Sequence, residues 1–357
     1  MPYSDNSEIK REFFIGASTA AGYESCCDDI FKKARKIYII KGAPGTGKSQ
    51  LMKKIAAKAA EDGYSAELFY CSSDADSLDA VYIPETGICI TDGTAPHVKE
   101  TDIPGSRDEI LNLGEFWDSK KLEKNGETIL RLMKEKQKLY SAVFDKLNLC
   151  GKLCRQSKDI LSASSDAEKL DSAARRIVKG FGKAAEAPDI IYRQLESVGM
   201  TGTRRLDTFG KLCEKRFYIS GRYNSSVLFF DALLRAAKEV GQSVWISRSP
   251  LCGMNVNALY FPAANVSVTN AGSENSDADL QNVKIINMER FISSKAIRES
   301  KNRLKLLSGF GGDILSEIEN NFAKIKKLHF ELEGIYGGAM DFEKVDKYSK
   351  KVLKTIF

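Results

Sequence analysis

The segment Gly42-Ala43-Pro44-Gly45-Thr46-Gly47-Lys48-Ser49 has the residue types and the spacing of a phosphate-binding loop. Its glycines permit backbone dihedral angles that other residues avoid, and they let N–H groups approach phosphate oxygens. Lys48 would reach the β- and γ-phosphates as a point charge, and the Ser49 hydroxyl would bind Mg²⁺. The alternative interpretation is a glycine-rich turn between a core strand and a surface helix. The expected nucleotide contacts are Gly42, Ala43, Pro44, Gly45, Thr46, Gly47, Lys48, Ser49 and Gln50.

The sequence on both sides of this loop predicts the elements that must hold it. Upstream, Ile37-Tyr38-Ile39-Ile40 is β-branched or aromatic throughout, which is typical of a buried strand. A strand, the loop and a helix therefore follow in the required order, and the helix N-terminus adds a partial positive charge. The downstream apolar residues that recur at helical spacing are Leu51, Met52, Ile55, Ala56 and Ala59.

A second candidate for metal binding is Asp92, which follows the apolar run Ile88-Cys89-Ile90-Thr91 as the acidic residue of a Walker B element does. Such a carboxylate binds the Mg²⁺ that bridges two phosphates. The alternative is a turn, because Asp followed by Gly93 is a common turn pair. Many ATP hydrolases carry Glu directly after this Asp, so Gly93 at that position predicts slow hydrolysis.

Three carboxylates and three hydroxyls lie in Cys71–Asp79, after the next expected strand. Ligands of open α/β sheets bind at the carboxyl ends of strands, so one of these groups could orient the attacking water. Asp74 is nearest the strand end and is the first candidate for this catalytic role, beside Lys48 and Asp92. The alternative is a solvated turn that caps the next element.

Further polar candidates lie outside these segments. His97, just past the expected sheet edge, could sense the γ-phosphate or lie on the surface without such a role. His329 falls on an apolar helical stripe and is expected to be structural. An arginine finger, which neutralises charge on the transferring phosphoryl group, could come from four residues that otherwise form a solvated face. They are Arg175, Arg176, Arg204 and Arg205.

The chain contains an internal repeat, which predicts two related halves. Residues 63–92 align without a gap on residues 241–270, and Phe13-Phe14-Ile15 resembles Phe217-Tyr218-Ile219. The Phe13 and Phe217 segments are separated by 204 positions, but the matching segments that begin at 63 and 241 are separated by only 178. The second copy is therefore expected to lack about 26 residues between these two matches. These correspond to the first strand, the glycine loop and the lysine. The acidic position is neutral Asn270 in the second copy, so we expect one nucleotide site, in the N-terminal half.

The composition is typical of a globular protein with two domains. The chain has 357 residues, of which 43% are hydrophobic and 29% charged. Its net charge of +6 includes no polybasic block, so nucleic-acid binding is not indicated. No apolar run approaches the roughly 18 residues that span a bilayer, and the polar start is unlike a signal peptide, so we expect a cytoplasmic protein without membrane contact. The eight cysteines lack zinc-site spacing and are expected to be reduced thiols.

Helical segments are expected outside the repeated cores. Apolar stripes at three- and four-residue intervals run from Ile129 to Cys154 and from Ile314 to Leu332, which predicts helical hairpins. Residues 156–212 are expected to form a mobile helical insertion and, in one interpretation, a lid over the nucleotide. The predicted division is a nucleotide-binding half with a hairpin at 1–150, a helical linker or lid at 151–212, and a degenerate half with C-terminal helices at 213–357.

A family resemblance rests on four segments, Lys41–Ser49, Cys71–Asp74, Leu78–Pro84 and Asp92–His97. Together they resemble a family of bacterial P-loop ATPases that have two tandem related halves. The likeness covers nearly the whole chain and is strongest from about residue 11 to about residue 120. In that family the second half commonly keeps a glycine loop, and this chain departs from the pattern by lacking it. The resemblance implies ATP binding and a cytoplasmic setting, and it implies no substrate.

The sequence thus predicts an α/β protein with a duplicated parallel sheet of the P-loop NTPase type, flanked by helices and carrying helical hairpin insertions. The expected activity is ATP binding with slow Mg²⁺-dependent hydrolysis at one site, with ATP, ADP and Mg²⁺ as ligands. GTP is less expected, because the chain has no Asn-Lys-x-Asp motif. Two alternatives stay open: a small-molecule kinase at the same site, and a nucleotide-gated protein whose helical hairpins recruit a protein partner.

Overall fold

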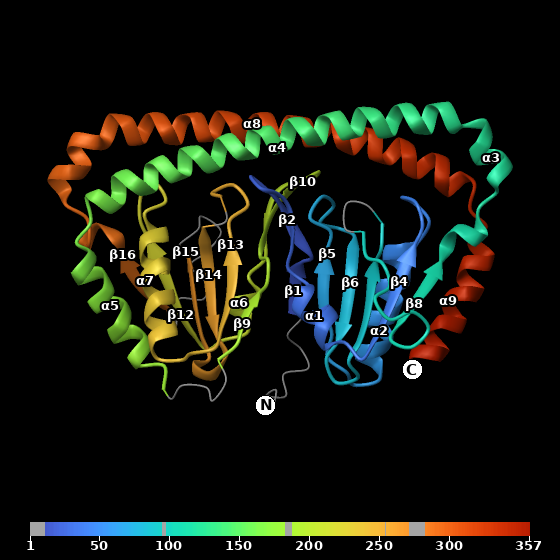
Figure 1. Cartoon of the computed structure of the whole chain (residues 1–357), viewed down its shortest axis with the longest axis horizontal. Helices are drawn as coiled ribbons and strands as arrows, with labels where there is room; N and C mark the ends of the chain where they lie inside the picture. The colour runs from blue at the N-terminus through green and yellow to red at the C-terminus, as the bar shows by residue number, and fades with distance from the viewer. Residues whose placement is uncertain (1–10, 95–97, 183–187, 254, 271–282) are drawn as a thin grey trace.

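The computed structural model describes residues 11–94, 98–182, 188–253, 255–270 and 283–357. In this part of the chain, two α/β halves lie side by side beneath a pair of long helices (Figure 1). Each half is built on a six-stranded sheet flanked by helices. The α/β class and the duplication predicted from the sequence are therefore confirmed.

The first half has a mixed sheet rather than the expected parallel one. Its elements are β1 (Arg11–Phe14), β2 (Gly16–Thr19), β3 (Gly22–Ser25), α1 (Asp28–Lys33), β4 (Lys36–Lys41), α2 (Lys48–Glu61), β5 (Glu67–Tyr70), β6 (Leu78–Ile83), β7 (Ile88–Asp92), β8 (Asp108–Asn112), η1 (Leu113–Phe116), α3 (Ser119–Lys124), α4 (Gly126–Ala163) and α5 (Ala167–Lys179). The strand order is β1-β5-β6-β7-β4-β8, and β6 runs antiparallel to both of its neighbours. The other pairs are parallel.

The second half repeats this plan. Its elements are β9 (Ile190–Tyr192), β10 (Glu196–Gly199), β11 (Gly202–Arg205), α6 (Thr208–Lys211), β12 (Lys215–Ser220), α7 (Ser226–Glu239), β13 (Val244–Arg248), β14 (Val256–Phe261), η2 (Pro262–Ala264), β15 (Val266–Asn270), β16 (Val283–Asn287), η4 (Met288–Arg290), α8 (Ser294–Gly338) and α9 (Phe342–Ile356). The strand order is β9-β13-β14-β15-β12-β16, with β14 antiparallel to both neighbours and the other pairs parallel.

The strand before the loop is present in the second half, which corrects the expected loss of about 26 residues. β12 lies between β15 and β16, as β4 lies between β7 and β8. The segment Phe217–Ile219 therefore corresponds to β4. It does not correspond to Phe13–Ile15 at the end of β1, whose counterpart is β9. Short apolar strands resemble one another in sequence, and only their positions in the sheet tell them apart.

What the second half has lost is the chemistry of the glycine loop. Residues 221–225 join β12 to α7, and Tyr223 and Asn224 there have φ of 56° and 63°. This left-handed region favours glycine, and in the first half Gly45 and Gly47 occupy it. The second loop keeps Gly221 directly after its strand, where the first has Gly42, but it places Tyr223 and Asn224 in the left-handed region instead of glycines. α7 begins at Ser226, where α2 begins at Lys48. The second loop therefore has no lysine to place on a phosphate.

Two long helices, α4 and α8, cross both halves as an antiparallel pair (Figure 1). Val143, Leu147 and Cys150 of α4 are buried in one cluster with Ile318 and Phe322 of α8. The two apolar stripes found in the sequence therefore pack against each other. Each was expected to form a helical hairpin within its own half, and the structure instead pairs them between the halves.

The shorter helices α5 and α9 follow the long helices in the sequence, and each packs on the other half. α5 packs on α7 of the second half, and α9 packs on α2 and η1 of the first half. The predicted linker at 151–212 is therefore not purely helical. It holds the end of α4, all of α5, the short α6 and three strands, of which β9 is an edge strand of the second sheet. In the ranges that the structure describes, we find no helix with the length and apolar character needed to cross a membrane.

The two halves meet around one buried arginine. Arg193, directly after β9, is 4% exposed. Its guanidinium donates hydrogen bonds to the Asp29 carboxylate at 2.9 and 3.1 Å and to Glu67 Oε2 at 3.3 Å. The same group joins aromatic rings of both halves, with its carbon 5.8, 5.6 and 5.5 Å from the ring centroids of Phe13, Phe69 and Trp245.

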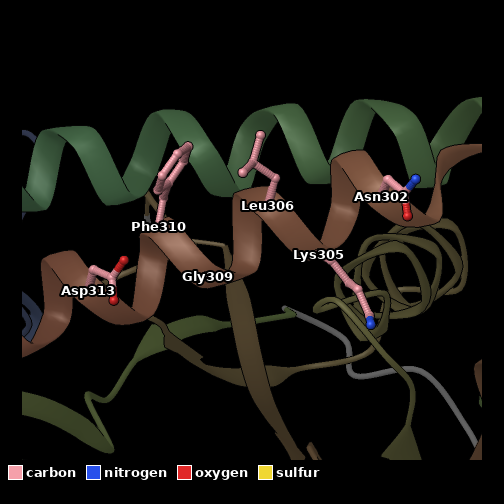
Figure 2. Close-up of a pocket in the computed structure, with 6 residues that line it drawn as sticks. All are labelled: Asn302, Lys305, Leu306, Gly309, Phe310 and Asp313. Carbon is pink, nitrogen blue, oxygen red and sulfur yellow. The ribbon is translucent and has the colours of Figure 1, made fainter.

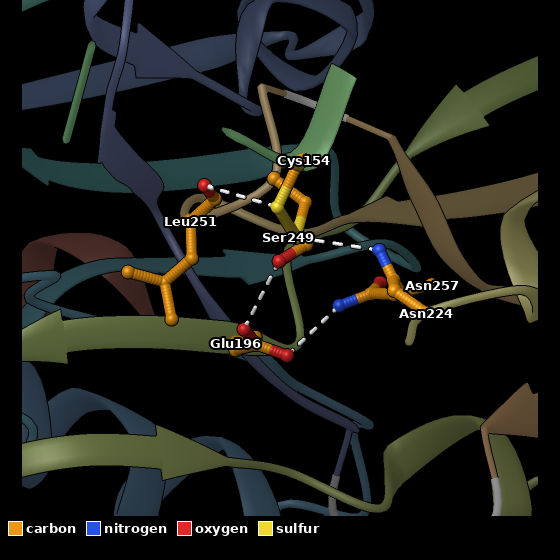
Figure 3. The surroundings of a disulfide bond; sticks show 7 residues. Cys154, Glu196, Asn224, Ser249, Leu251 and Asn257 are labelled. Carbon is orange, nitrogen blue, oxygen red and sulfur yellow. Dashed lines mark hydrogen bonds between the residues drawn. A yellow bond between two sulfur atoms is a disulfide. The ribbon is translucent and has the colours of Figure 1, made fainter. Parts of the chain in front are cut away.

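Cys154 and Cys252 form a disulfide (Figure 3), so the expectation that all eight cysteines are reduced is wrong for this pair. The six other cysteines are free. The bond joins α4 to the loop after β13 across 98 positions of sequence, so the spacing of the cysteines gave no sign of it. Asn224 Nδ2 donates a hydrogen bond to Cys252 Sγ at 3.3 Å, which ties the disulfide to the degenerate loop.

Replacing both bridged cysteines, Cys154→Ser with Cys252→Ser, should lower the free energy of unfolding by about 2–4 kcal/mol, because a crosslink across a long segment restricts the unfolded chain. Thermal unfolding followed by circular dichroism would measure the loss. Reductant should lower the melting temperature of the wild-type protein and leave that of the double variant unchanged. A thiol titration in denaturant that counts eight thiols rather than six in the oxidised protein would contradict the bond.

Candidate functional site

The glycine-rich loop joins β4 to α2, as the sequence predicts. Gly45 and Gly47 have φ of 75° and 95°, which other residues rarely adopt. A Cβ on Gly42 would lie 2.6 Å from Thr46 Oγ1, so this position also requires glycine. The Thr46 hydroxyl donates a hydrogen bond to the Ala43 carbonyl at 2.8 Å and fixes the curve of the loop. α2 carries no acidic residue in its first turn, so the positive end of the helix faces the loop without neutralisation.

Lys48 and Asp92 meet beside this loop. The Lys48 ammonium donates to the carbonyl oxygens of Gly42 and Ala43 at 2.8 and 2.9 Å. It also lies 3.5 Å from Asp92 Oδ2. Thr94 donates its N–H and its hydroxyl to Asp92 Oδ1 at 2.8 and 2.7 Å. Burial raises the pKa of Asp92, and the charge of Lys48 opposes this rise.

Asn270 stands in the second sheet where Asp92 stands in the first. Asn270 pairs with Ile219 on β12, and Asp92 pairs with Ile40 on β4. Because the strands match in order and register, the exchange of a carboxylate for a neutral amide, predicted from the repeat, is confirmed. The second half therefore lacks an anionic group at this place.

The other predicted polar groups differ in their surroundings. Ser49, in the first turn of α2, accepts a hydrogen bond on its Oγ from the Leu78 N–H at 3.0 Å. Asp74 closes its own turn, because its carboxylate accepts from the Ser77 hydroxyl at 2.6 Å and from the Asp76 N–H at 3.3 Å. The turn interpretation of Asp74 therefore describes its contacts in the structure.

Asp79 lies deeper than Asp74 at the start of β6. It is 6% exposed, and its negative charge contributes to the raised pKa of Asp92. Two carboxylates on neighbouring strands thus lie within electrostatic range of each other, and Asp92 is also within range of Lys48. In the sequence, Asp79 is only one of three acidic candidates. The structure distinguishes it from Asp74 and Asp76, because it alone lies within β6.

These groups line one cavity of about 860 Å³. Every predicted contact from Gly42 to Gln50 borders it, together with Asp74 and Asp92. The sequence did not single out the residues that form the rest of the wall, because they come from distant elements. Examples are Ser18, Tyr23, Tyr140, Phe144 and Met200.

The roof of the cavity comes from α4 and α8. Lys136 Nζ of α4 lies 2.9 Å from His329 Nδ1 of α8, and His329 Nε2 lies 3.4 Å from Glu333 Oε1. All three side chains line the cavity, so His329, which the sequence predicts to be structural, also borders the candidate site. Lys136 is one lysine among many on an amphipathic helix, and its position in the sequence carries no signal of this contact.

Several predicted candidates lie elsewhere. The four arginines considered as a finger are not among the residues that line the cavity. Arg175 pairs with Glu239 at 2.9 Å, and Arg205 pairs with Glu196 at 2.7 Å. His97 lies outside the described residues. Among the described lining residues, the predicted lid at 156–212 supplies Met200 alone, so α4 and α8 cover the loop in its place.

A second, shallower hollow of about 460 Å³ lies on α8 (Figure 2). Leu306 and Phe310 extend from the helix there and are 56% and 50% exposed. Its charged lining groups are Lys305 and Asp313, and all of its lining residues belong to α8. Because the glycine loop, Lys48 and Asp92 all border the larger cavity, we assign the candidate site to that cavity.

Comparisons of the chain with protein-family models, with curated proteins and with solved structures found no match. Within the described ranges, no three or more His, Cys, Asp or Glu side chains converge as a metal site. The larger cavity instead offers the loop N–H groups, Lys48, the Ser49 hydroxyl and the buried carboxylates of Asp79 and Asp92. This donor set suits a phosphate-bearing ligand with Mg²⁺, since Mg²⁺ is commonly held by one or two carboxylates together with the substrate's own phosphates.

Proposed function

We propose that the larger cavity binds ATP with Mg²⁺ and hydrolyses the ATP slowly, at a single site in the first half. The observation that carries this proposal is the convergence of the glycine loop, Lys48 and Asp92 on one cavity of about 860 Å³. The loop N–H groups and the N-terminus of α2 would hold phosphate oxygens. Lys48 would turn from the carbonyls of Gly42 and Ala43 to the β- and γ-phosphates.

Ser49 and Asp92 are the residues that would hold Mg²⁺, which neutralises charge on the phosphates when it is bound. Asp79 joins Asp74 as a candidate for orienting the attacking water, because it lines the cavity and its charge acts on Asp92. Gly93 follows Asp92 where many ATP hydrolases carry Glu. This difference supports slow turnover.

A small-molecule kinase is the second candidate, and the polar lining outside the glycine loop favours it. Ser18, Tyr23 and Tyr140 also line the cavity and offer hydroxyl groups that could bind an acceptor in place of water. Recruitment of a protein partner by the long helices stays a prediction from the sequence, as does a cytoplasmic setting.

Calorimetric titration with ATP and Mg²⁺, together with an assay of γ-labelled ATP, tests the proposal. We expect one equivalent of ATP per chain and label in inorganic phosphate. Label in a metabolite would select the kinase. Two bound equivalents would contradict the single site, and the absence of binding at millimolar ATP would overturn the proposed function.

A further inference from the structure

Lys136 lines the same cavity as the glycine loop and is held there by a neutral partner. Its ammonium can only donate, so His329 Nδ1 accepts and the ring hydrogen lies on Nε2, 3.4 Å from Glu333 Oε1. The His329 side chain is 16% exposed, which restricts access of water to this contact. The contact positions the ammonium but does not neutralise its charge.

The electrostatic surroundings favour an anion beside this ammonium. Burial lowers the pKa of Lys136 and the charge of Lys48 adds to the effect, while Cys71 and Glu333 oppose it. Two cations therefore lie within electrostatic range of each other in one cavity. A triphosphate on the glycine loop would place negative charge near both and remove their repulsion.

The roof lies close enough to the loop for such a contact. A Cβ on Gly45 would lie 2.7 Å from the Glu333 carbonyl oxygen, and a Cβ on Gly337 would lie 3.6 Å from the Gly45 carbonyl oxygen. α8 therefore rests on the loop itself. His329 precedes Glu333 by one helical turn, a rise of about 6 Å. The partner of Lys136 thus lies about one turn from the contact between roof and loop.

In the second half, where the loop has no lysine, the residues at the equivalent roof positions can be compared with Lys136 and His329. The α3–α4 segment and α8 have equal length and begin at equivalent places, so they align without a gap. In this alignment Lys136 corresponds to Gly311, and His329 corresponds to Cys154. Cys154 is tied by the disulfide to the loop after β13. The roof cation and its partner are therefore absent where Ser226 replaces the loop lysine.

We infer that Lys136 is a cationic finger, which leaves His329 and binds the terminal phosphate of the nucleotide on the glycine loop. The inference rests on the proposed function. In hydrolysis the water oxygen bonds to the γ-phosphorus as the bond from that phosphorus to the bridging oxygen breaks. ADP keeps the bonding electrons, and the proton of the water passes to phosphate or solvent. Lys136 neutralises negative charge on the phosphoryl oxygens during this step, the role expected of an arginine.

The variant Lys136→Met tests this assignment with three measurements. It should bind ADP within about twofold of wild type, because the finger contacts only the terminal phosphate. It should bind the non-hydrolysable analogue AMPPNP about 10- to 100-fold more weakly, and it should form ADP from ATP about 10²- to 10³-fold more slowly. Lys138→Met is the matched control, because Lys138 is an exposed lysine of the same helix, and it should match wild type in all three.

Lys136→Gln keeps a polar contact with His329 and provides the same test if the methionine variant does not fold. Unchanged AMPPNP affinity and unchanged ADP formation in a folded variant would overturn the inference. Equal weakening of ADP and AMPPNP would also overturn it, because Lys136 would then not distinguish the terminal phosphate. A wild-type protein that binds neither nucleotide would instead overturn the proposed function.

Discussion

Lys48→Ala should abolish tight ATP binding and lower the rate of ADP formation by about 10²- to 10³-fold. The Lys48 ammonium is the cation nearest the loop carbonyls, and its removal leaves the buried carboxylate of Asp92 without its partner at 3.5 Å. The phosphates then lose a charge-assisted contact, and Asp92 repels them more strongly. Calorimetry would measure the loss of affinity, and a coupled assay of ADP would measure the rate.

Ser226→Ala is the matched control for this variant, because Ser226 begins α7 as Lys48 begins α2. Asn270→Ala serves the same purpose for Asp92. Both control variants should leave ATP affinity almost unchanged, since the second half lacks the lysine and the carboxylate. Losses as large as that of Lys48→Ala would mean that the two halves share a composite pocket, against the single-site proposal. Circular dichroism would verify that each variant is folded.

Arg193→Met should lower the free energy of unfolding by about 3–5 kcal/mol, the range expected when one partner of a buried ion pair is removed. Arg193 and Glu67 are 4% and 3% exposed, so the Glu67 carboxylate would stay buried without a cation. The loss also removes the guanidinium from three aromatic rings at the junction of the halves. Equilibrium unfolding in urea would measure the change.

Two further variants isolate the cause of this loss. Glu67→Gln in the Arg193→Met background should recover part of the stability, because it removes the unpaired buried charge. Arg175→Met should leave the free energy of unfolding almost unchanged, because the Arg175–Glu239 pair is exposed at 54% and 50%. An equally small loss for Arg193→Met would show that its site is open to water.

The sequence predicted the parts of the candidate site that are local in the chain. The glycine loop, Lys48 and Ser49 lie within one strand–loop–helix unit, where residue type and spacing alone set the geometry. Asp92 could also be predicted from the sequence, because an apolar strand that ends in a carboxylate has a recognisable pattern. For Asp74 the pattern left two interpretations, and the hydrogen bonds of its turn separate them.

The contacts between distant segments could not be predicted in this way. Periodicity shows which face of a helix is apolar, but it does not identify the surface that covers that face. The apolar stripes of α4 and α8 were therefore equally consistent with two separate hairpins and with the pairing observed. The Lys136–His329 contact and the Cys154–Cys252 bond depend on that pairing or on the sheet beneath it.

By itself, the sequence determined that this protein has an α/β fold with two related halves, and that one half alone carries a glycine loop with a lysine. Those features follow from local backbone preferences and from the order of residues. Only the tertiary structure decided that the sheets are mixed, that the second half keeps its strand and loop, and that helices from both halves cover one cavity. These outcomes depend on which apolar surfaces bury each other, and that choice is made by the whole chain at once.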